Sequence, residues 1–581
     1  MAEAAFYVIM FVIAVTALTI CPKIQEKMNL LVSIMFSYVT VLCIGALGAF
    51  IINAVGIPIR LLTMGTVYLL IAIFGIFICI QKRAVQRLFI RKWDIVALVV
   101  CTLAVGLVSL YIFTPYIHIN FYNAVDPSVH YAWAMEVVRK ERINGMFFAA
   151  LYNGMIINLF KWTLPADWTY KAFIIAYIFH VLIEFLFFYA VAVILMKKAK
   201  KQWCPLVISL LYWCGYPLFS FAVGGYVYWG MAVMLVEYVL LLLREYEKRA
   251  EGRMVLLACG LTGCFGVSIC YIQLAPGLFL TFFGMLIYHA VQDRKIQFNK
   301  KNIIMTVCGI AVAGVCALIG YQMIFASRNL KIFEVFKIGS MSTNALELLV
   351  ICPFVIGVLL EIRNRGEKWN VFHISTFIYV VMQFVMTLMS GLGLISTYYL
   401  FKTYIVLWFL VFAVLMEKGS YLGKERRGQW RLYILGVICF LTLSYDGKDS
   451  MAVSVNHSIF MKNMEILANT DFSKGYMSDN GKLYLFQYAM EELPKESTVP
   501  LVITNERVGA GSWYQGIYER GTYIVQPTWS KEELEAALEK NDVQYFIIFY
   551  DDLIYRELLR DYLNTYERVY ENENGFIAKR N

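Results

Sequence analysis

A carboxylate and a histidine stand four positions apart in a short polar stretch between two long apolar runs. The stretch, YNAVDPSVHYAWAMEVV from Tyr122 to Val138, contains Asp126 and His130. A carboxylate in such a place can take a proton from an acceptor hydroxyl or bind a divalent metal ion. Because residues four apart on a helix share a face, both side chains can serve one site. The stretch is therefore the first candidate for catalysis.

The same stretch has the sequence of a helix N-terminus. Asp126 followed by Pro127 is typical of an N-cap and the first helical position. An apolar strip of Val129, Trp133 and Val137 then predicts an amphipathic helix on the membrane surface, and MFFAALYNGMIINLFKW predicts a second one. The alternative is structural, because a cap carboxylate stabilises a helix by about 1 kcal/mol without any chemistry. His130 is open to the same alternative, as a packed histidine.

The composition places these helices in a membrane protein. The chain has 581 residues, of which 60% are hydrophobic, 16% aromatic and 16% charged, and its net charge is +10. A mean hydropathy of +0.64 and repeated apolar runs of about 20 residues indicate a polytopic α-helical protein. The basic residues cluster between apolar runs, as topology signals do, and do not indicate nucleic-acid binding. The 13 cysteines show no metal-binding spacing, so we interpret them as core residues.

About 14 apolar runs have the length and composition of membrane spans. Every odd-numbered run is followed by a loop rich in Lys and Arg, and most even-numbered runs are followed by a loop poor in them. By the positive-inside rule, the basic loops are cytoplasmic and both chain ends are extracytoplasmic. We therefore expect a multi-pass protein of the cell membrane, with runs that begin near residues 5, 29, 58, 94, 171, 204, 223, 254, 272, 303, 343, 372, 397 and 431.

This topology places two large segments outside the membrane. One is a loop of residues 116–170, which holds the two surface helices, and the other is the C-terminal tail. The predicted organisation is a set of additional N-terminal helices in 1–92, a membrane core in 93–445 and an extracytoplasmic α/β domain in 446–581. The inner loops are all short, so any chemistry is expected on the outer face.

The tail has the pattern of a compact α/β domain. TVPLVI and VQYFIIF predict buried strands, and SKEELEAALEK predicts a helix with a capping box of Ser530 and Glu533. YERVYENENGFIAKR predicts a hairpin that turns at Asn574 and Gly575, because both residues tolerate positive φ. The Gly-rich loop NERVGAGSWY matches neither common phosphate-binding pattern, so an ordinary strand-to-helix connection is favoured.

Basic residues near the predicted outer ends of spans are further candidates. Lys402 stands about five residues into its span, where a lysine either extends to the interface or meets an anion. Its neighbours Tyr398 and Tyr399 could supply hydroxyls and stacking faces for a phosphosugar. Arg328, in a predicted external loop, could clamp a lipid phosphate or simply contact anionic head groups.

Two outer turns and one pair inside a span complete the candidates. The turn VGGYVYWGM contains Tyr228, whose aromatic neighbours favour an interface belt over sugar stacking, and YIQLAPG contains Gln273, a polar group that could touch substrate. His180 and Glu184 stand four apart inside a span, where ionisable groups are functional candidates by default. The alternative is a hydrogen-bonded pair that joins helices.

In this pattern the chain resembles the GT-C superfamily of polytopic glycosyltransferases, which use polyprenyl-phosphate-linked sugar donors. The resemblance rests on the first large external loop with Asp126 and His130, the surface helices, the many spans and the external α/β domain. It implies that Asp126 is the catalytic carboxylate and that Lys402, within STYYLFKTYIVLW, is a ligand of the donor phosphate. The remaining candidates would bind substrate: His130, Tyr398, Tyr399, Arg328, Gln273 and Tyr228.

Two departures from the superfamily pattern bear on the chemistry. The external loop contains no paired acidic DxD motif, and the WWDYG motif of oligosaccharyltransferases is absent from the sequence. No residue is therefore assigned as a metal ligand. The cofactor prediction is left open between none and a divalent ion such as Mg²⁺ or Mn²⁺.

The leading hypothesis is an inverting glycosyltransferase. It would transfer a sugar from a polyprenyl-phosphate donor to a cell-surface glycan, a teichoic acid or a lipid-linked acceptor on the outer face of the membrane. Its partners would be that donor, the acceptor and the bilayer, with no nucleic acid. One alternative is a transporter or flippase of lipid-linked saccharides, for which internal symmetry is expected and none is visible. The other is a non-catalytic envelope assembly protein that uses the tail to bind a partner.

Overall fold

The computed structural model shows a helical membrane protein with a small C-terminal sheet. Within the described residues, six helices are long and apolar enough to cross a bilayer. The described residues are 1–21, 27–82, 85–113, 125–143, 147–161, 169–197, 201–219, 227–248, 253–292, 300–321, 368–419, 484–485, 488–489, 492–494, 501–502, 524–525, 530–540, 543–550, 560 and 566–580.

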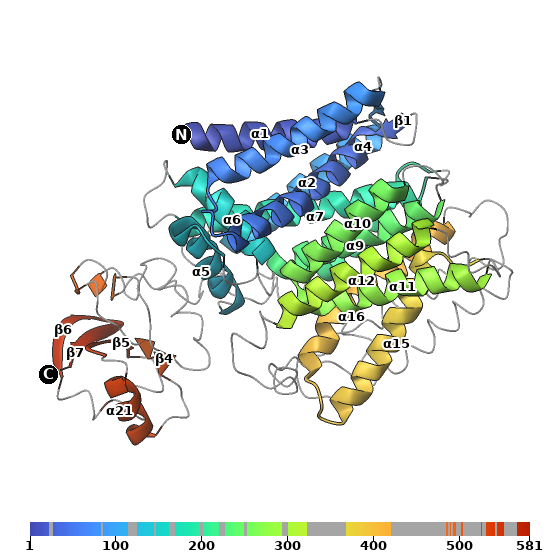
Figure 1. The fold of residues 1–581 in the computed structure, drawn as a ribbon. Coiled ribbons are helices and arrows are strands. Elements are labelled where there is room, and N and C mark those ends of the chain that lie inside the picture. Colours follow the sequence, from blue (N-terminus) through green and yellow to red (C-terminus); the bar gives the residue numbers. More distant parts are fainter. Residues whose placement is uncertain are drawn as a thin grey trace. The chain divides into compact units, whose positions relative to one another are not determined.

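The chain divides into two compact units. The first holds most of the membrane helices, and the second holds the two predicted surface helices and the tail (Figure 1). The first unit comprises Met1–Leu103, His180–Ser220 and Tyr228–Ala468, and the second comprises Ala104–Phe179, Phe221–Val227 and Asn469–Asn581.

The described helices follow the predicted apolar runs. A described helix lies at each run except those near residues 343 and 431, which are outside the described residues. This outcome is expected, because an apolar segment in lipid can satisfy its own backbone hydrogen bonds only as a helix. The helices are α1 Ala2–Ile20, α2 Leu30–Ala54, α3 Leu61–Lys82, α4 Lys92–Phe113, α7 Thr169–Leu195, α8 Cys204–Phe219, α9 Val227–Lys248, α10 Arg253–Cys270, α11 Ala275–Gln292, α12 Lys300–Tyr321, α15 Val371–Gly391 and α16 Thr397–Gly419.

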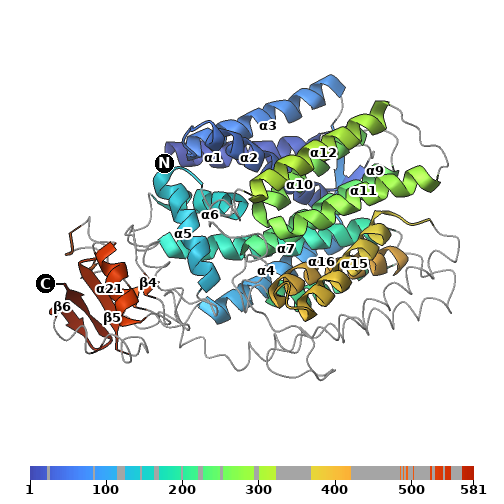
Figure 2. The same cartoon turned by 60° about the horizontal axis from the view of Figure 1, so that its bottom comes forward.

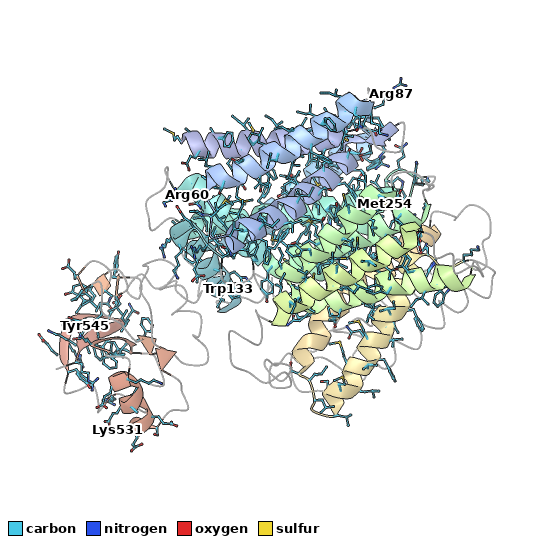
Figure 3. All side chains as sticks on the ribbon, in the orientation of Figure 1. Arg60, Arg87, Trp133, Met254, Lys531 and Tyr545 are labelled. Atoms are coloured by element: carbon cyan, nitrogen blue, oxygen red, sulfur yellow. The ribbon has the colours of Figure 1, made fainter. Side chains whose placement is uncertain are left out.

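Small residues bring α1 and α3 into close contact. A Cβ atom on Gly65 would lie 2.7 Å from the ring of Phe6, and one on Gly75 would lie 3.1 Å from the Cβ of Ala17. Since lipid gives helices no hydrophobic reason to associate, such close packing is what holds them together. Figure 3 labels Arg60, which directly precedes α3, and Arg87, which begins the short strand β2 Arg87–Phe89.

A buried carboxylate ties the N-terminal helices to α4 and α7. Asp94 is 3% exposed and accepts hydrogen bonds from the Asn29 side chain, from the Arg91 backbone and guanidinium, and from the Tyr189 hydroxyl at 3.0 Å. Asn29 also caps α2 by accepting from the Val32 amide at 3.1 Å. Because the carboxylate is saturated with donors and paired with a cation, its burial is compensated.

A second polar network joins the C-terminal ends of α9 and α16 to the N-terminus of α15. Glu417 of α16 pairs with Arg244 of α9, and Asn370 donates its side-chain amide to the same carboxylate. Asn370 also caps α15, where His373 completes a capping box. Helices α15 and α16 lie side by side, with α11 packed against α15 (Figure 2). The network therefore fixes the position of α16 along the bundle.

In the second unit, α5 Val125–Lys140 and α6 Phe147–Phe160 form the helix pair predicted for the first external loop. A Cβ on Gly154 would lie 2.7 Å from the Cβ of Val137, so this glycine lets the two helices approach closely. The Tyr131 hydroxyl bonds to the Thr169 hydroxyl at 2.5 Å, which links α5 to the start of α7.

Two details of α5 differ from the prediction. The helix begins at Val125, so Asp126 lies inside the first turn and is not the N-cap. Within the predicted strip, only Val137 is buried, and Val129 and Trp133 are partly exposed. The buried face instead includes His130, at 5% exposure, and it is the face that a partner helix covers. A surface helix was expected to bury its face in lipid, and packing against α6 shifts that face.

The tail forms a mixed five-stranded sheet in the order β4-β3-β5-β7-β6. Strands β3, β4 and β5 are parallel, whereas β7 is antiparallel to both β5 and β6. The predicted strands and hairpin are confirmed, and β4 is a strand that the sequence did not predict. The elements are β3 Leu501–Val502, β4 Ile524–Val525, α21 Lys531–Lys540, β5 Tyr545–Phe549, β6 Glu567–Asn572 and β7 Gly575–Lys579.

In the tail, the capping box forms as predicted, whereas the hairpin turn is shifted by one residue. The Glu533 amide donates to the Ser530 hydroxyl at 3.2 Å, and the Ser530 amide donates to the Glu533 carboxylate at 2.8 Å, as predicted. The hairpin turns one residue earlier than predicted, and Gly575 already belongs to β7. This glycine has no positive φ. It is required because a Cβ there would overlap the carbonyl oxygen of Ile548.

Candidate functional site

Three chain segments that are distant in sequence meet around Lys402. Lys402 lies in the second turn of α16, Tyr228 and Trp229 open α9, and Tyr271 joins α10 to the short 3₁₀ helix η3 Ile272–Leu274. These are the segments that the sequence placed at separate outer turns and at the outer end of one span. The helices bring all of them to one end of the bundle.

The ammonium of Lys402 is enclosed by aromatic rings. Its Nζ lies 3.9 Å from the ring centroid of Trp229, 5.7 Å from that of Tyr228 and 6.0 Å from that of Tyr271. Trp229 and Lys402 are both 0% exposed. Ring faces within about 6 Å attract a cation, and the attraction reaches about 2 kcal/mol when the pair is desolvated. We call Lys402, Tyr228, Trp229 and Tyr271 the aromatic lysine site.

Hydrogen bonds hold the backbone of this site in register. The Trp229 indole N–H donates to the Lys402 carbonyl at 3.3 Å, and the Cys270 thiol lies 3.1 Å from the Tyr228 carbonyl. On α16, Thr403 accepts from the Gln383 side-chain amide of α15 at 2.7 Å. The first turns of α9 and α16 and the end of α10 are therefore fixed to one another.

A glycine contact places η3 against α15. The Tyr379 hydroxyl donates to the Leu274 carbonyl at 3.3 Å, and a Cβ on Gly277 would lie 2.5 Å from that hydroxyl. Gln273, in the same segment, is partly exposed, and its Oε1 atom is buried without a hydrogen-bond partner in the described structure. An acceptor in this state costs about 1–3 kcal/mol, which a polar ligand group could recover.

An acidic side chain packs against the same part of α9. Glu184 of α7 is 8% exposed, and a Cβ on Gly230 would lie 2.6 Å from its Cδ. Gly230 directly follows Trp229, so a glycine is needed there to seat the carboxylate beside the aromatic lysine site. A second acid on α9, Glu237, accepts a hydrogen bond from the Tyr212 hydroxyl at 2.8 Å. Glu184 thus contacts α9, and His180, predicted to act with it, is buried one turn earlier.

The structure changes two predictions at this end. Lys402 does not extend to the interface, because its side chain is completely buried. Tyr228 is 4% exposed and Trp229 is 0% exposed, so these two aromatics do not form the lipid-facing belt that was the favoured interpretation. Sequence analysis did not single out Trp229, although this ring is the nearest to the ammonium. The only available signal was its place in an aromatic-rich turn.

Several predicted site residues remain predictions. The side chains of Asp126, Tyr398 and Tyr399 and the whole of Arg328 are outside the described part of the chain. The backbone shows that Asp126 and His130 occupy one face of α5, being four apart within the helix. Across the described residues, no three His, Cys, Asp or Glu side chains are grouped so that they could hold a metal ion.

The comparison with solved structures includes a distant structural likeness. The fold is similar to the archaeal oligosaccharyltransferase AglB from Archaeoglobus fulgidus, solved in complex with an inhibitory peptide and a dolichol-phosphate. The TM-score is 0.32 and the sequence identity 10%, over 81% of this chain and 70% of that chain. No protein-family model matches the sequence. No curated protein matches it either.

Proposed function

We propose that this polytopic membrane protein is a glycosyltransferase that uses a lipid-phosphate-linked sugar donor. The observation that carries the proposal is the aromatic lysine site, a buried cation surrounded by ring faces at one end of the bundle. A lysine within a membrane helix is costly, and such residues are usually retained for function. Ring faces that hold a cation can also stack on a sugar, so the site suits a ligand with a sugar next to a phosphate.

The proposed role of Lys402 is to stabilise the leaving group. When the bond between the anomeric carbon and the phosphate oxygen breaks, the electron pair stays on the lipid phosphate, whose negative charge increases. A preorganised ammonium in a water-poor site stabilises that charge more strongly in the transition state than in the ground state. Gln273 is proposed to orient the sugar through its buried oxygen.

Asp126 is the proposed base, on sequence grounds. Its carboxylate would take the proton from the acceptor hydroxyl while the hydroxyl oxygen attacks the anomeric carbon from the side opposite the phosphate. One displacement of this kind inverts the anomeric configuration. The position near the N-terminus of α5 suits the role, because the helix dipole favours an ionised carboxylate there. An acceptor on the predicted outer face would be a glycan, a teichoic acid or a lipid-linked saccharide.

The test is sugar transfer by membranes that contain matched amounts of the wild type or of Asp126→Asn, with a labelled polyprenyl-phosphate-sugar pool as donor. Asn keeps the size of the side chain and cannot accept the proton, so transfer should be abolished while folding is preserved. Equal transfer by both proteins would remove Asp126 from the mechanism. Absence of donor consumption by the wild type would favour the transporter or assembly hypothesis.

A further inference from the structure

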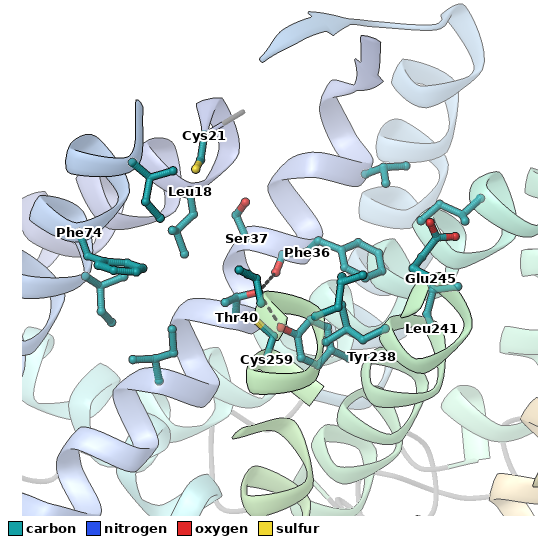
Figure 4. A pocket seen from close by; sticks show the side chains of 18 of the residues that line it. Leu18, Cys21, Phe36, Ser37, Thr40, Phe74, Tyr238, Leu241, Glu245 and Cys259 are labelled. Atoms are coloured by element: carbon teal, nitrogen blue, oxygen red, sulfur yellow. Dashed lines mark hydrogen bonds between the residues drawn. The ribbon is translucent and has the colours of Figure 1, made fainter. Parts of the chain in front are cut away.

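A long cavity in the first unit is lined by the N-terminal helices on one side and by α7 to α10 on the other. Its volume is 1580 Å³. Figure 4 shows Thr40 of α2 between Leu18 and Phe74 on the α1 and α3 side and Tyr238 on the α9 and α10 side. This cavity is separate from the aromatic lysine site, whose residues do not line it.

The inside of the cavity is suited to an apolar occupant. The Thr40 hydroxyl donates to the Phe36 carbonyl at 2.7 Å and bonds to the Tyr238 hydroxyl at 2.8 Å, so these polar groups are satisfied within the protein. Around them, several large apolar side chains that line the cavity are exposed. The most exposed are Ile51 at 55%, Leu70 at 62%, Phe74 at 61% and Val255 at 64%. Hydrocarbon chains would cover this surface favourably.

The cavity is about as long as the membrane is thick. Both Thr63, near the start of α3, and Lys82, at its end, line it. At 1.5 Å per residue, these two positions are about 28 Å apart along the helix, close to the hydrocarbon thickness of about 30 Å. An acyl chain can therefore lie in the cavity roughly parallel to the membrane normal, as it does in the bilayer.

Charge is confined to one end of the cavity. Its charged lining residues end α3, follow α7, precede α4 and α8, or lie near the end of α9: Lys82, Lys197, Arg91, Lys201 and Glu245. Arg91 is paired with Asp94 at 2.9 Å, and Glu245 is paired with Arg244 at 3.2 Å. Lys82, Lys197 and Lys201 are exposed, and none of them forms an ion pair with the described residues. This end therefore attracts anions.

The basic end and the aromatic lysine site belong to opposite ends of the bundle. Trp229 opens α9 and Glu245 lies near its last turn, so about 24 Å of helix separate them. A lipid whose phosphate lies at Lys402 cannot also place that phosphate at the basic end. The positive-inside pattern predicts that the three lysines are cytoplasmic.

We propose that the cavity binds an anionic glycerophospholipid of the cytoplasmic leaflet. Its phosphate lies at Lys82, Lys197 and Lys201, and its acyl chains lie along α2 toward Thr40. The lipid fills the space between the N-terminal helices and α9 and α10, beside the direct contacts of α2 with α9 and α10. The lysines at the basic end favour a negatively charged head group, and the apolar lining contacts the acyl chains.

The head-group test uses full-length protein purified in detergent and depleted of lipid. Native mass spectrometry counts bound lipid during titration with phosphatidylglycerol or with phosphatidylcholine. We expect one tightly bound phosphatidylglycerol and weaker phosphatidylcholine. Each lysine should contribute about fivefold to affinity, so Lys82→Gln, Lys197→Gln and Lys201→Gln together should remove about a hundredfold. Lys92→Gln is the matched control, because Lys92 is exposed at the same membrane end without lining the cavity.

The binding of the acyl chains is tested by a substitution that fills part of the cavity. Leu70→Trp places a large side chain in the lining of α3, whereas Ile73→Trp changes an exposed residue of the same helix that does not line the cavity. Leu70→Trp should weaken lipid binding and reduce the rise in melting temperature on adding phosphatidylglycerol, and Ile73→Trp should leave both unchanged. Both positions are exposed, so neither substitution disturbs a packed core.

Three results would overturn the proposal. They are equal binding of the two phospholipids, retention of phosphatidylglycerol by the triple lysine variant, and equal effects of Leu70→Trp and Ile73→Trp on lipid binding. All of these measurements are independent of sugar transfer. Failure here therefore leaves the proposed glycosyltransferase function untouched, and failure of transfer leaves the lipid site untouched.

Discussion

Replacing Lys402 by methionine separates a functional lysine from a structural one. Methionine has a similar length and flexibility without the charge. A lysine at the centre of a membrane helix costs about 2.5–3.5 kcal/mol, and the aromatic rings return about 2 kcal/mol of this. Lys402 lies in the second turn of α16, away from the centre, so the cost there is at the lower limit. The two terms nearly cancel, and Lys402→Met should change the free energy of unfolding by no more than about 1 kcal/mol.

The effect on transfer should be much larger. A hydrogen bond between charged groups contributes about 1.5–3 kcal/mol, which corresponds to a loss of about 10- to 150-fold in kcat/KM when the ammonium is removed. Transfer is measured in membranes with a labelled lipid-phosphate-sugar donor, and stability is measured by thermal unfolding of the purified protein in detergent. Lys140→Met is the control, because Lys140 is 62% exposed and pairs only with Glu136 among the described ion pairs, one helical turn away.

Two outcomes would refute the reasoning. Transfer at the wild-type rate would show that Lys402 does not contact the donor phosphate. A loss of stability of about 3 kcal/mol or more, with transfer reduced only in proportion to folded protein, would make the lysine structural, since removing one member of a buried polar network has that cost. A stable, inactive variant is the result that the aromatic lysine site predicts.

Three further predictions concern packing. Gly230→Ala should lower stability by about 1–3 kcal/mol because its Cβ meets the Glu184 carboxylate, and Glu184→Ala in the same chain should restore part of the melting temperature. Gly575→Ala should increase amide hydrogen exchange along the tail sheet, because its Cβ overlaps the Ile548 carbonyl; unchanged exchange would contradict that contact. Ser530→Ala removes one half of the capping box and should destabilise α21 by about 1 kcal/mol, measurable by exchange in that helix, whereas Ser530→Asp should not.

The sequence predicts local structure well where the signal is local. Apolar runs predict the membrane helices, and the pair of Ser530 and Glu533 predicts a capping box, because in each case the physical cause lies within a few residues. The hairpin shows where prediction from local sequence fails. A turn at Asn574 and Gly575 is the usual interpretation, yet the glycine is required by a neighbouring strand that the local sequence does not reveal.

The aromatic lysine site could be predicted only in pieces. Lys402, Tyr228 and Tyr271 come from three helix ends, and hydrophobic periodicity indicates which face of a helix is apolar without indicating which helix covers it. An aromatic turn at the predicted membrane interface is therefore assigned to a lipid-facing belt. Only the packing of α16 against η3 and α9 converts those rings into a cation site.

The two buried charges of α16 show why the surroundings of a charge decide its role. Lys402 and Glu417 are fifteen residues apart, about 22 Å along the helix, and both are nearly inaccessible. Glu417 is matched by the guanidinium of Arg244 and the amide of Asn370, so its charge is neutralised and its lone pairs serve to fix helix ends. The ring faces at Lys402 hold an ammonium without adding a negative charge. The proposed function gives this ammonium a donor phosphate to stabilise, whereas the described contacts of Glu417 join helix ends. We therefore expect substitutions at Glu417 to act on stability and substitutions at Lys402 to act on transfer.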